Sequence, residues 1–153
     1  NKTNFSFAKS YYHWFFLIQP YPLPEKLINK DPQFYLRSKM NSFGEVNDVH
    51  TPEAMKEYIR CFCNEETIHS TCEDYRASST IDLVHDKEDN QKLLMPLLAV
   101  WGNDGFVGQN YNVISEWKRV AQNVSGIGVP GGHYIAEESP KEFLKVIIPF
   151  LSD

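Results

Sequence analysis

A continuous apolar run in the second half of the chain constrains its fold more than any other feature of the sequence. Residues 95–102 are all apolar apart from the glycine that ends the run. A short run of this kind is typical of a strand buried on both faces, in a sheet covered by helices. The sequence therefore predicts a β-strand that ends at Gly102.

The residues after this run continue the same order of elements. We predict a helix around residues 113–121, a second strand near residues 125–129 and a last helix from about residue 139 to residue 151. Strand, helix, strand, helix is the doubly wound pattern of α/β proteins, whose functional loops follow the carboxyl ends of the strands. Because two strands make a poor sheet, we expect them to be the last strands of a larger sheet whose earlier strands precede Asn1.

The first 90 residues have a different, helical character. Proline is tolerated in the first turn of a helix, so helices are predicted to start at residues 23–24, 31–32 and 51–52. A further helix is predicted to begin at Asn64, and no segment of this zone shows a strand pattern. We therefore predict a helical domain over residues 1–90 and the α/β part over residues 91–153.

Charge, hydropathy and cysteine content exclude several classes of function. The net charge of −5 argues against a nucleic-acid partner, and no apolar run approaches the roughly 18 residues of a membrane span. The odd number of cysteines favours free, buried thiols in a reducing, cytoplasmic compartment. A zinc site at Cys61, Cys63, His69 and Cys72 is disfavoured because residues two apart diverge around a helix. We expect no metal and no cofactor.

One histidine follows the second predicted strand in a setting suited to proton transfer. The segment Pro130-Gly131-Gly132-His133 predicts a sharp turn that presents an imidazole, whose pKa near neutrality suits a general base. Asp104 follows the first predicted strand, so its loop and that of His133 could lie at the same sheet edge. Asp104 then either orients the imidazole or is an ordinary turn aspartate beside glycine. No residue of the chain has the setting of a nucleophile.

A second group of candidate residues lies in the helical zone. His13 and Trp14 are adjacent, and Tyr75 lies near the end of the same zone. A His-Trp pair is most often core packing. However, imidazole, indole and phenol are all hydrogen-bond donors, and three donors that converge in a dry pocket would stabilise a leaving halide ion.

Four segments together resemble the haloacetate (fluoroacetate) dehalogenases of the α/β-hydrolase superfamily: residues 12–20, 23–25, 72–77 and 130–133. The resemblance extends over nearly the whole chain. It implies an α/β-hydrolase fold, of which this chain carries the C-terminal part of the sheet, with an all-helical cap domain over the active site. It also implies that His13, Trp14 and Tyr75 bind halide and that His133 is the general base.

The resemblance further implies a cofactor-independent hydrolysis of short 2-haloacids, such as haloacetate, through an aspartyl ester. In that family the nucleophilic aspartate, the arginines that bind the substrate carboxylate and the acid that orients histidine lie upstream of the His-Trp segment. We therefore expect this chain alone to be inactive. Arg37, Arg60 and Arg76 are available cations, but solvated helix positions are the favoured interpretation.

Two other functions remain open from the sequence. An epoxide hydrolase of the same superfamily could use Tyr12 and Tyr75 to protonate the epoxide oxygen. A non-catalytic α/β-hydrolase could instead bind a small ligand. The expected partners are a small halogenated carboxylate and water, and a homodimer is left open.

Overall fold

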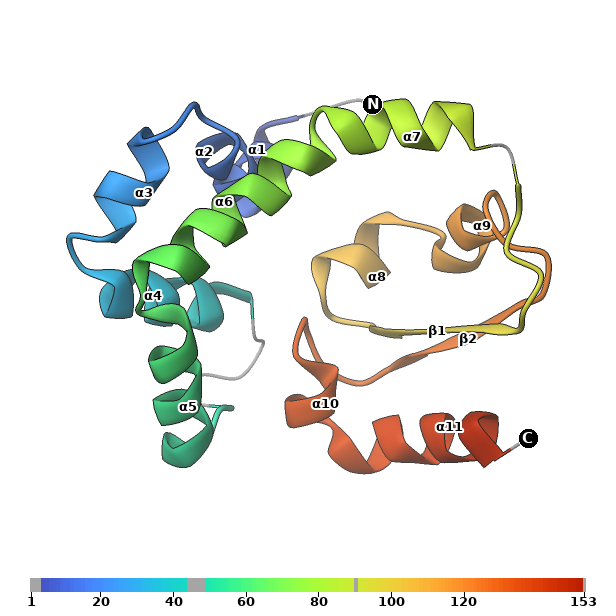
Figure 1. Ribbon diagram of the computed structural model, residues 1–153. Helices are drawn as coiled ribbons and strands as arrows, with labels where there is room; N and C mark the ends of the chain where they lie inside the picture. Colours follow the sequence, from blue (N-terminus) through green and yellow to red (C-terminus); the bar gives the residue numbers. More distant parts are fainter. Residues whose placement is uncertain (1–3, 44–48, 90, 153) are drawn as a thin grey trace. The chain divides into compact units, whose positions relative to one another are not determined.

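The computed structural model describes residues 4–43, 49–89 and 91–152, which group into two compact units (Figure 1). One unit comprises Asn1–Ser38 with Pro52–Asn90, and the other comprises Lys39–Thr51 with Gln91–Asp153. The chain thus changes unit close to the predicted boundary at residue 90. The segment Lys39–Thr51, which the sequence grouped with the helices, belongs to the second unit.

The described part of the first unit contains helices and no strand. Its helices are α1 (Phe5–Ser10), α2 (Tyr12–Leu17), α3 (Leu23–Ile28), α5 (Pro52–Phe62), α6 (Glu65–Ser78) and α7 (Ile81–Glu88), and α4 (Pro32–Phe43) runs from the first unit into the second. The predicted starts of α3, α4, α5 and α6 are confirmed. Local caps explain two of them: Asp31 accepts from the N–H of Phe34, and Asn64 accepts from the N–H of Thr67.

Helix α6 is the centre of the helical unit. Its residues Ile68 and Cys72, one turn apart, are fully buried and pack with Leu17 of α2 and Ile28 of α3. Rings and side chains of intermediate burial surround this cluster: Phe16, Tyr35, Phe62 and Tyr75. The core therefore fixes α2 and α3 against the same helix that carries Tyr75.

The cysteines are free, as predicted, but they are not all buried. Cys72 belongs to the core, Cys63 is half-buried and Cys61 is exposed. The prediction of buried thiols was therefore wrong for Cys61, because this residue lies on the outer face of α5 next to the Glu57 carboxylate.

The second unit contains two parallel strands with helices on both sides (Figure 1). Strands β1 (Leu97–Gly102) and β2 (Val124–Val129) pair in register from Leu97 opposite Val124 to Gly102 opposite Val129. Helices α8 (Phe106–Asn110) and α9 (Val113–Trp117) connect the strands, and α10 (Ile135–Glu138) and α11 (Pro140–Ser152) follow them. Figure 1 shows α8 and α9 on one side of the strands and α11 on the other. The doubly wound arrangement is confirmed.

The details of this unit differ from the prediction in three places. The predicted helix 113–121 ends at Trp117, and Ala121 instead pairs with Leu93 in an isolated bridge. Helices α8 and α10 were not predicted. Only Ala99 and Gly102 of β1 are buried and its other residues are half-buried, so the expected burial on both faces is met only in part.

The strand ends bring two loops into close contact. A Cβ atom at Gly102 would lie 1.9 Å from the backbone oxygen of Gly132, so only glycine fits at the end of β1. The turn after β2 therefore packs directly on the end of β1. No helix of the described residues combines the length and apolar character of a membrane-spanning segment.

Candidate active site

Backbone hydrogen bonds to two carboxylates hold the turn that carries His133. The Glu138 carboxylate accepts from the N–H groups of Gly132 and Tyr134, at 2.6 and 2.9 Å. Asp104 accepts from the N–H of Gly131 at 3.1 Å. Gly131 has a φ of 112°, a left-handed conformation that glycine adopts without strain. The turn is thus fixed by charge-assisted bonds on both sides of the histidine.

Asp104 lies beside the His133 turn, as the strand order predicted. Its N–H donates to the backbone oxygen of Gly131 at 3.0 Å, and its carboxylate accepts from the N–H of the same residue. These bonds explain Asp104 as a residue that joins the two loops. Its role as the acid that orients the imidazole stays a prediction.

The His133 side chain has a pKa suited to a base at neutral pH. Partial desolvation lowers the pKa of His133 below its ordinary value, and the nearby Glu138 carboxylate opposes part of this change. The imidazole is therefore mostly neutral at pH 7 and able to accept a proton. Its role as general base stays a prediction.

The three predicted halide ligands form an aromatic cluster inside the helical unit. Tyr75 of α6 meets both neighbours of α2 edge to face: its ring centroid lies 5.8 Å from that of His13 and 5.1 Å from that of Trp14. His13 is buried, whereas 39% of Trp14 is exposed. Burial, with a smaller contribution from Asp74, raises the pKa of Tyr75, so its hydroxyl keeps its proton. Residues distant in sequence therefore lie in one cluster, and their role in halide binding stays a prediction.

An ion-pair network beside this cluster ties α3 and the segment after α2 to α6. Arg76 donates through Nε to the backbone oxygen of Gln19 at 2.9 Å, and its Nη2 lies 2.8 Å from Glu25 Oε1. Burial would raise the pKa of Glu25, but its own backbone N–H and Arg76 together hold the pKa below the ordinary value. The interpretation of Arg76 as a solvated residue was wrong, because only 15% of its side chain is exposed. Arg60 and Arg37 are exposed, as predicted.

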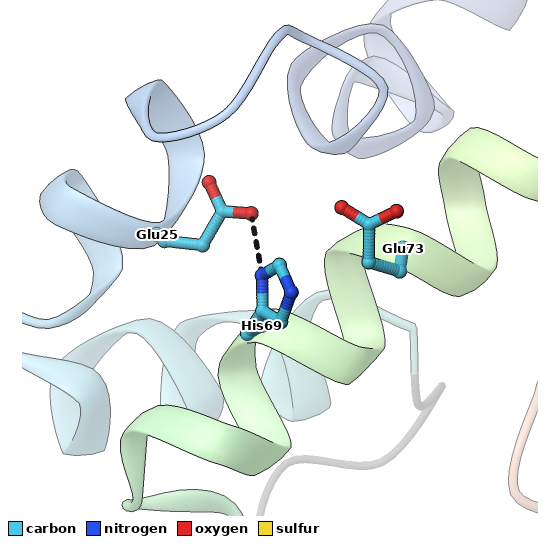
Figure 2. Close-up of side chains that lie close together, drawn as sticks. All are labelled: Glu25, His69 and Glu73. Carbon is cyan, nitrogen blue, oxygen red and sulfur yellow. Dashed lines mark ion pairs between the residues drawn. The ribbon is translucent and has the colours of Figure 1, made fainter.

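The same network contains the one group of the described residues spaced to hold a metal ion. The ligand atoms of Glu25, His69 and Glu73 lie within 4.8 Å of one another (Figure 2). However, Arg76 Nη1 lies 2.5 Å from Glu73 Oε1 and Nη2 contacts Glu25, so the guanidinium already neutralises both carboxylates. The arrangement is that of an ion-pair network rather than of a metal centre.

An open pocket of about 440 Å³ adjoins this network on the helical unit. Three carboxylates contribute to its wall, and the Tyr21 ring meets the His69 ring edge to face at 5.5 Å. The pocket residues are Tyr21, Glu25, Asn29, Glu65, Glu66 and His69. None of the residues predicted to act on a substrate lies among them.

The sequence did not single out several residues that hold the site. Glu138 was missed although it closely follows the glycine turn. An acid at this distance from a Gly-Gly turn can indicate a carboxylate that accepts from the N–H groups of the turn. Glu25 was missed because nothing local distinguishes it from other acids in a first helical turn. His50 was missed because its partner, Glu137, lies 87 residues away.

Comparison with known proteins identifies the fold. No protein-family model matches the chain. The chain is 46% identical to a candidate acyltransferase from Salmonella enterica and 48% identical to a candidate α/β-hydrolase from a Nostoc species. Each match covers 98% of this chain with a TM-score of 0.93, and covers 50% and 52% of the two neighbours. The chain has the α/β-hydrolase fold.

Two further relatives carry names that bear on the reaction. The chain is 32% identical, over 95% of its length, to 49% of a fluoroacetate dehalogenase from a Burkholderia species. It is also 32% identical to a candidate epoxide hydrolase from Pseudomonas aeruginosa, with a TM-score of 0.89, over 98% of this chain and 51% of that one. The chain thus spans about half the length of these α/β-hydrolase relatives.

Proposed function

We propose that the protein containing this chain is a hydrolytic dehalogenase of short 2-haloacids, with haloacetate as the model substrate. The observation that carries the proposal is the cluster in which Tyr75 packs on both His13 and Trp14. The similarity to a fluoroacetate dehalogenase supports it. The Salmonella, Nostoc and Pseudomonas neighbours support hydrolase-fold chemistry in general but not a particular substrate.

In the first step of the proposed reaction, a carboxylate oxygen of an upstream aspartate attacks the carbon that bears the halogen. A C–O bond forms, the C–X bond breaks, and its electron pair leaves with the halide. The N–H of Trp14, the O–H of Tyr75 and the imidazole of His13 stabilise the leaving ion. Donors arranged in advance are most valuable for fluoride, which is a poor leaving group.

In the second step, water cleaves the aspartyl ester. His133 takes a proton from water as the water oxygen attacks the ester carbonyl, which releases the 2-hydroxy acid and restores the aspartate. The net reaction of haloacetate with water yields glycolate, halide and one proton. A depressed pKa keeps His133 neutral and ready for this step.

The test uses a protein in which the upstream residues precede this chain, with fluoroacetate and chloroacetate as substrates. We expect halide release from the unaltered protein. Trp14→Phe keeps an aromatic ring but removes one donor, so halide release should fall about 10²- to 10³-fold. His133→Gln should release about one halide per protein and then stop, with a carboxymethyl ester detectable by mass spectrometry.

The result also separates the dehalogenase from the other candidate functions. No halide release from any haloacetate by the unaltered protein would refute the proposal. Turnover of epoxides that survives Trp14→Phe but is lost in Tyr75→Phe would identify an epoxide hydrolase. Ligand binding without turnover of either class would identify a binding module.

A further inference from the structure

His50 is a buried histidine that reaches the His133 turn from a distant part of the sequence. It lies just before α5, in the segment Lys39–Thr51 that belongs to the second unit. Its side chain is 3% exposed, and its Nδ1 lies 2.5 Å from Oε2 of Glu137. Its ring also packs edge to face on Tyr134, with centroids 4.8 Å apart. Tyr134 directly follows the candidate base, and Glu137 follows it by four residues.

Each partner of His50 is linked in sequence to the groups that hold the turn. Tyr134 directly follows His133, and their rings meet edge to face at 5.1 Å. Glu137 belongs to α10, as does Glu138, whose carboxylate accepts from the backbone of the turn. Helix α10 thus carries two adjacent carboxylates: one holds the turn and the other holds His50.

A helix of one turn cannot hold its own position, because it has few internal hydrogen bonds. The described contacts of α10 beyond its own turn therefore determine where it lies. The His50–Glu137 pair is a half-buried bond between a histidine and a carboxylate, which is stronger than a hydrogen bond between two neutral groups. Without it, Asp104 would still hold Gly131, but α10 and the Tyr134 ring, on the far side of His133, would lose a contact that fixes them.

We propose that His50 is a positioning residue for His133. By holding Glu137 and the Tyr134 ring, it keeps the turn where the imidazole of His133 can activate water. This inference rests on the proposed function, in which His133 acts only in the second step. A displacement of about 1 Å at a catalytic group can lower the rate about 10²-fold.

Three variants separate the two contacts of His50. His50→Phe keeps an aromatic ring against Tyr134 but removes the donor to Glu137. His50→Asn places an amide N–H near the position of Nδ1 but removes the ring. Glu137→Gln keeps the shape of the acceptor side chain but removes its charge. His85→Phe, at an exposed position of α7, is the matched control.

The measurements are the halide released in the first turnover, kcat and the imidazole NMR signals of His133. His50→Phe and Glu137→Gln should lower kcat about 10- to 100-fold and shift the His133 signals, whereas the first-turnover halide burst should be unchanged. His50→Asn should recover part of kcat, and His85→Phe should resemble the unaltered protein. A normal kcat in His50→Phe, or an equal loss of burst and kcat, would overturn the inference.

The proposed function and the positioning role can fail separately. If the unaltered protein releases no halide from haloacetates, the proposed function fails. The NMR comparison still decides the positioning role, because unchanged His133 signals in His50→Phe would show that the His50 contacts do not set the position of the imidazole.

Discussion

The helical unit and the sheet unit hold their candidate catalytic groups by different means. In the helical unit, Tyr75 is placed against His13 and Trp14 by packing of α6 on α2, supported by the buried contacts of Arg76. In the sheet unit, His133 is placed by N–H groups of its own turn that donate to Asp104 and Glu138. The first arrangement depends on side chains far apart in sequence, and the second depends on backbone geometry.

This difference determines which substitutions matter in each unit. Backbone geometry tolerates almost no added atom where two loops touch, because a backbone carbonyl cannot rotate away as a side chain can. Side-chain packing tolerates changes of shape better but not the loss of a buried charge partner. Substitutions at four places in the two units distinguish these two arrangements.

The largest effect is expected at the close contact between the two loops of the sheet unit. Gly102→Ala would place a methyl group 1.9 Å from the Gly132 oxygen and 2.4 Å from that of Gly131. The loops must separate, so the free energy of unfolding should fall by more than about 3 kcal/mol. At Gly131 the backbone has a positive φ, which strains an alanine, so Gly131→Ala should lower the free energy of unfolding by only about 1–2 kcal/mol. Equal losses in urea unfolding of the two variants would contradict the contact at Gly102.

In the helical unit, the corresponding weak point is the buried ion pair. Arg76→Met leaves the Glu25 carboxylate buried without its cation, and we expect a loss of about 3 kcal/mol in the free energy of unfolding. Arg76→Met with Glu25→Gln should recover much of this loss, because no buried charge then lacks a partner. Arg60→Met, at an exposed pair with Glu57, is the control and should change stability little. An equal effect of Arg60→Met and Arg76→Met would refute the importance of the buried pair.

The contrast also explains what the sequence predicted and what it did not. The starts of α3, α5 and α6 were predictable because proline and capping side chains act within one turn. Helix α8 was missed because Gly108 disfavours a helix. Glycine is needed at this position because a Cβ atom would lie 2.4 Å from the backbone oxygen of Gly102, a contact that the sequence does not reveal. Helix α7 has no side-chain cap and no buried residue. The sequence therefore offered neither a capping residue nor a buried apolar face from which its bounds could be predicted.

The site was predictable to a similar degree. The loop of Asp104 and the turn of His133 were placed together by strand order alone. The residues of the aromatic cluster were selected as hydrogen-bond donors and then by resemblance, and their contacts could not follow from their spacing in the sequence. The His50–Glu137 pair has no local signal of any kind, because neither residue belongs to a periodic pattern that includes the other.

A smaller effect is expected on the pH dependence of turnover, which should respond to a substitution in the sheet unit but not to one in the helical unit. Since His133 must be neutral to act as a base and its pKa is lowered, the rate should rise with pH, reach half its maximum below pH 6.5 and level off above it. Glu138 raises the pKa of His133, so Glu138→Gln should move this limb to lower pH. Glu25→Gln in the helical unit should leave the limb in place. A limb in Glu138→Gln at higher pH than in the unaltered protein would contradict the assignment of His133 as the base.

The smallest effect is expected at Tyr35, whose ring packs between Phe16 and Phe62. Its hydroxyl is buried and has no hydrogen-bond partner among the described residues, and burial raises the pKa of the group. Tyr35→Phe removes an unsatisfied polar atom without changing the ring. The free energy of unfolding should therefore stay the same or rise by up to about 1 kcal/mol. The melting temperature, which measures this change, should not fall. A clear loss of stability would show that the hydroxyl is bonded in solution, and that side-chain placement in the helical unit depends on more than apolar packing and ion pairs.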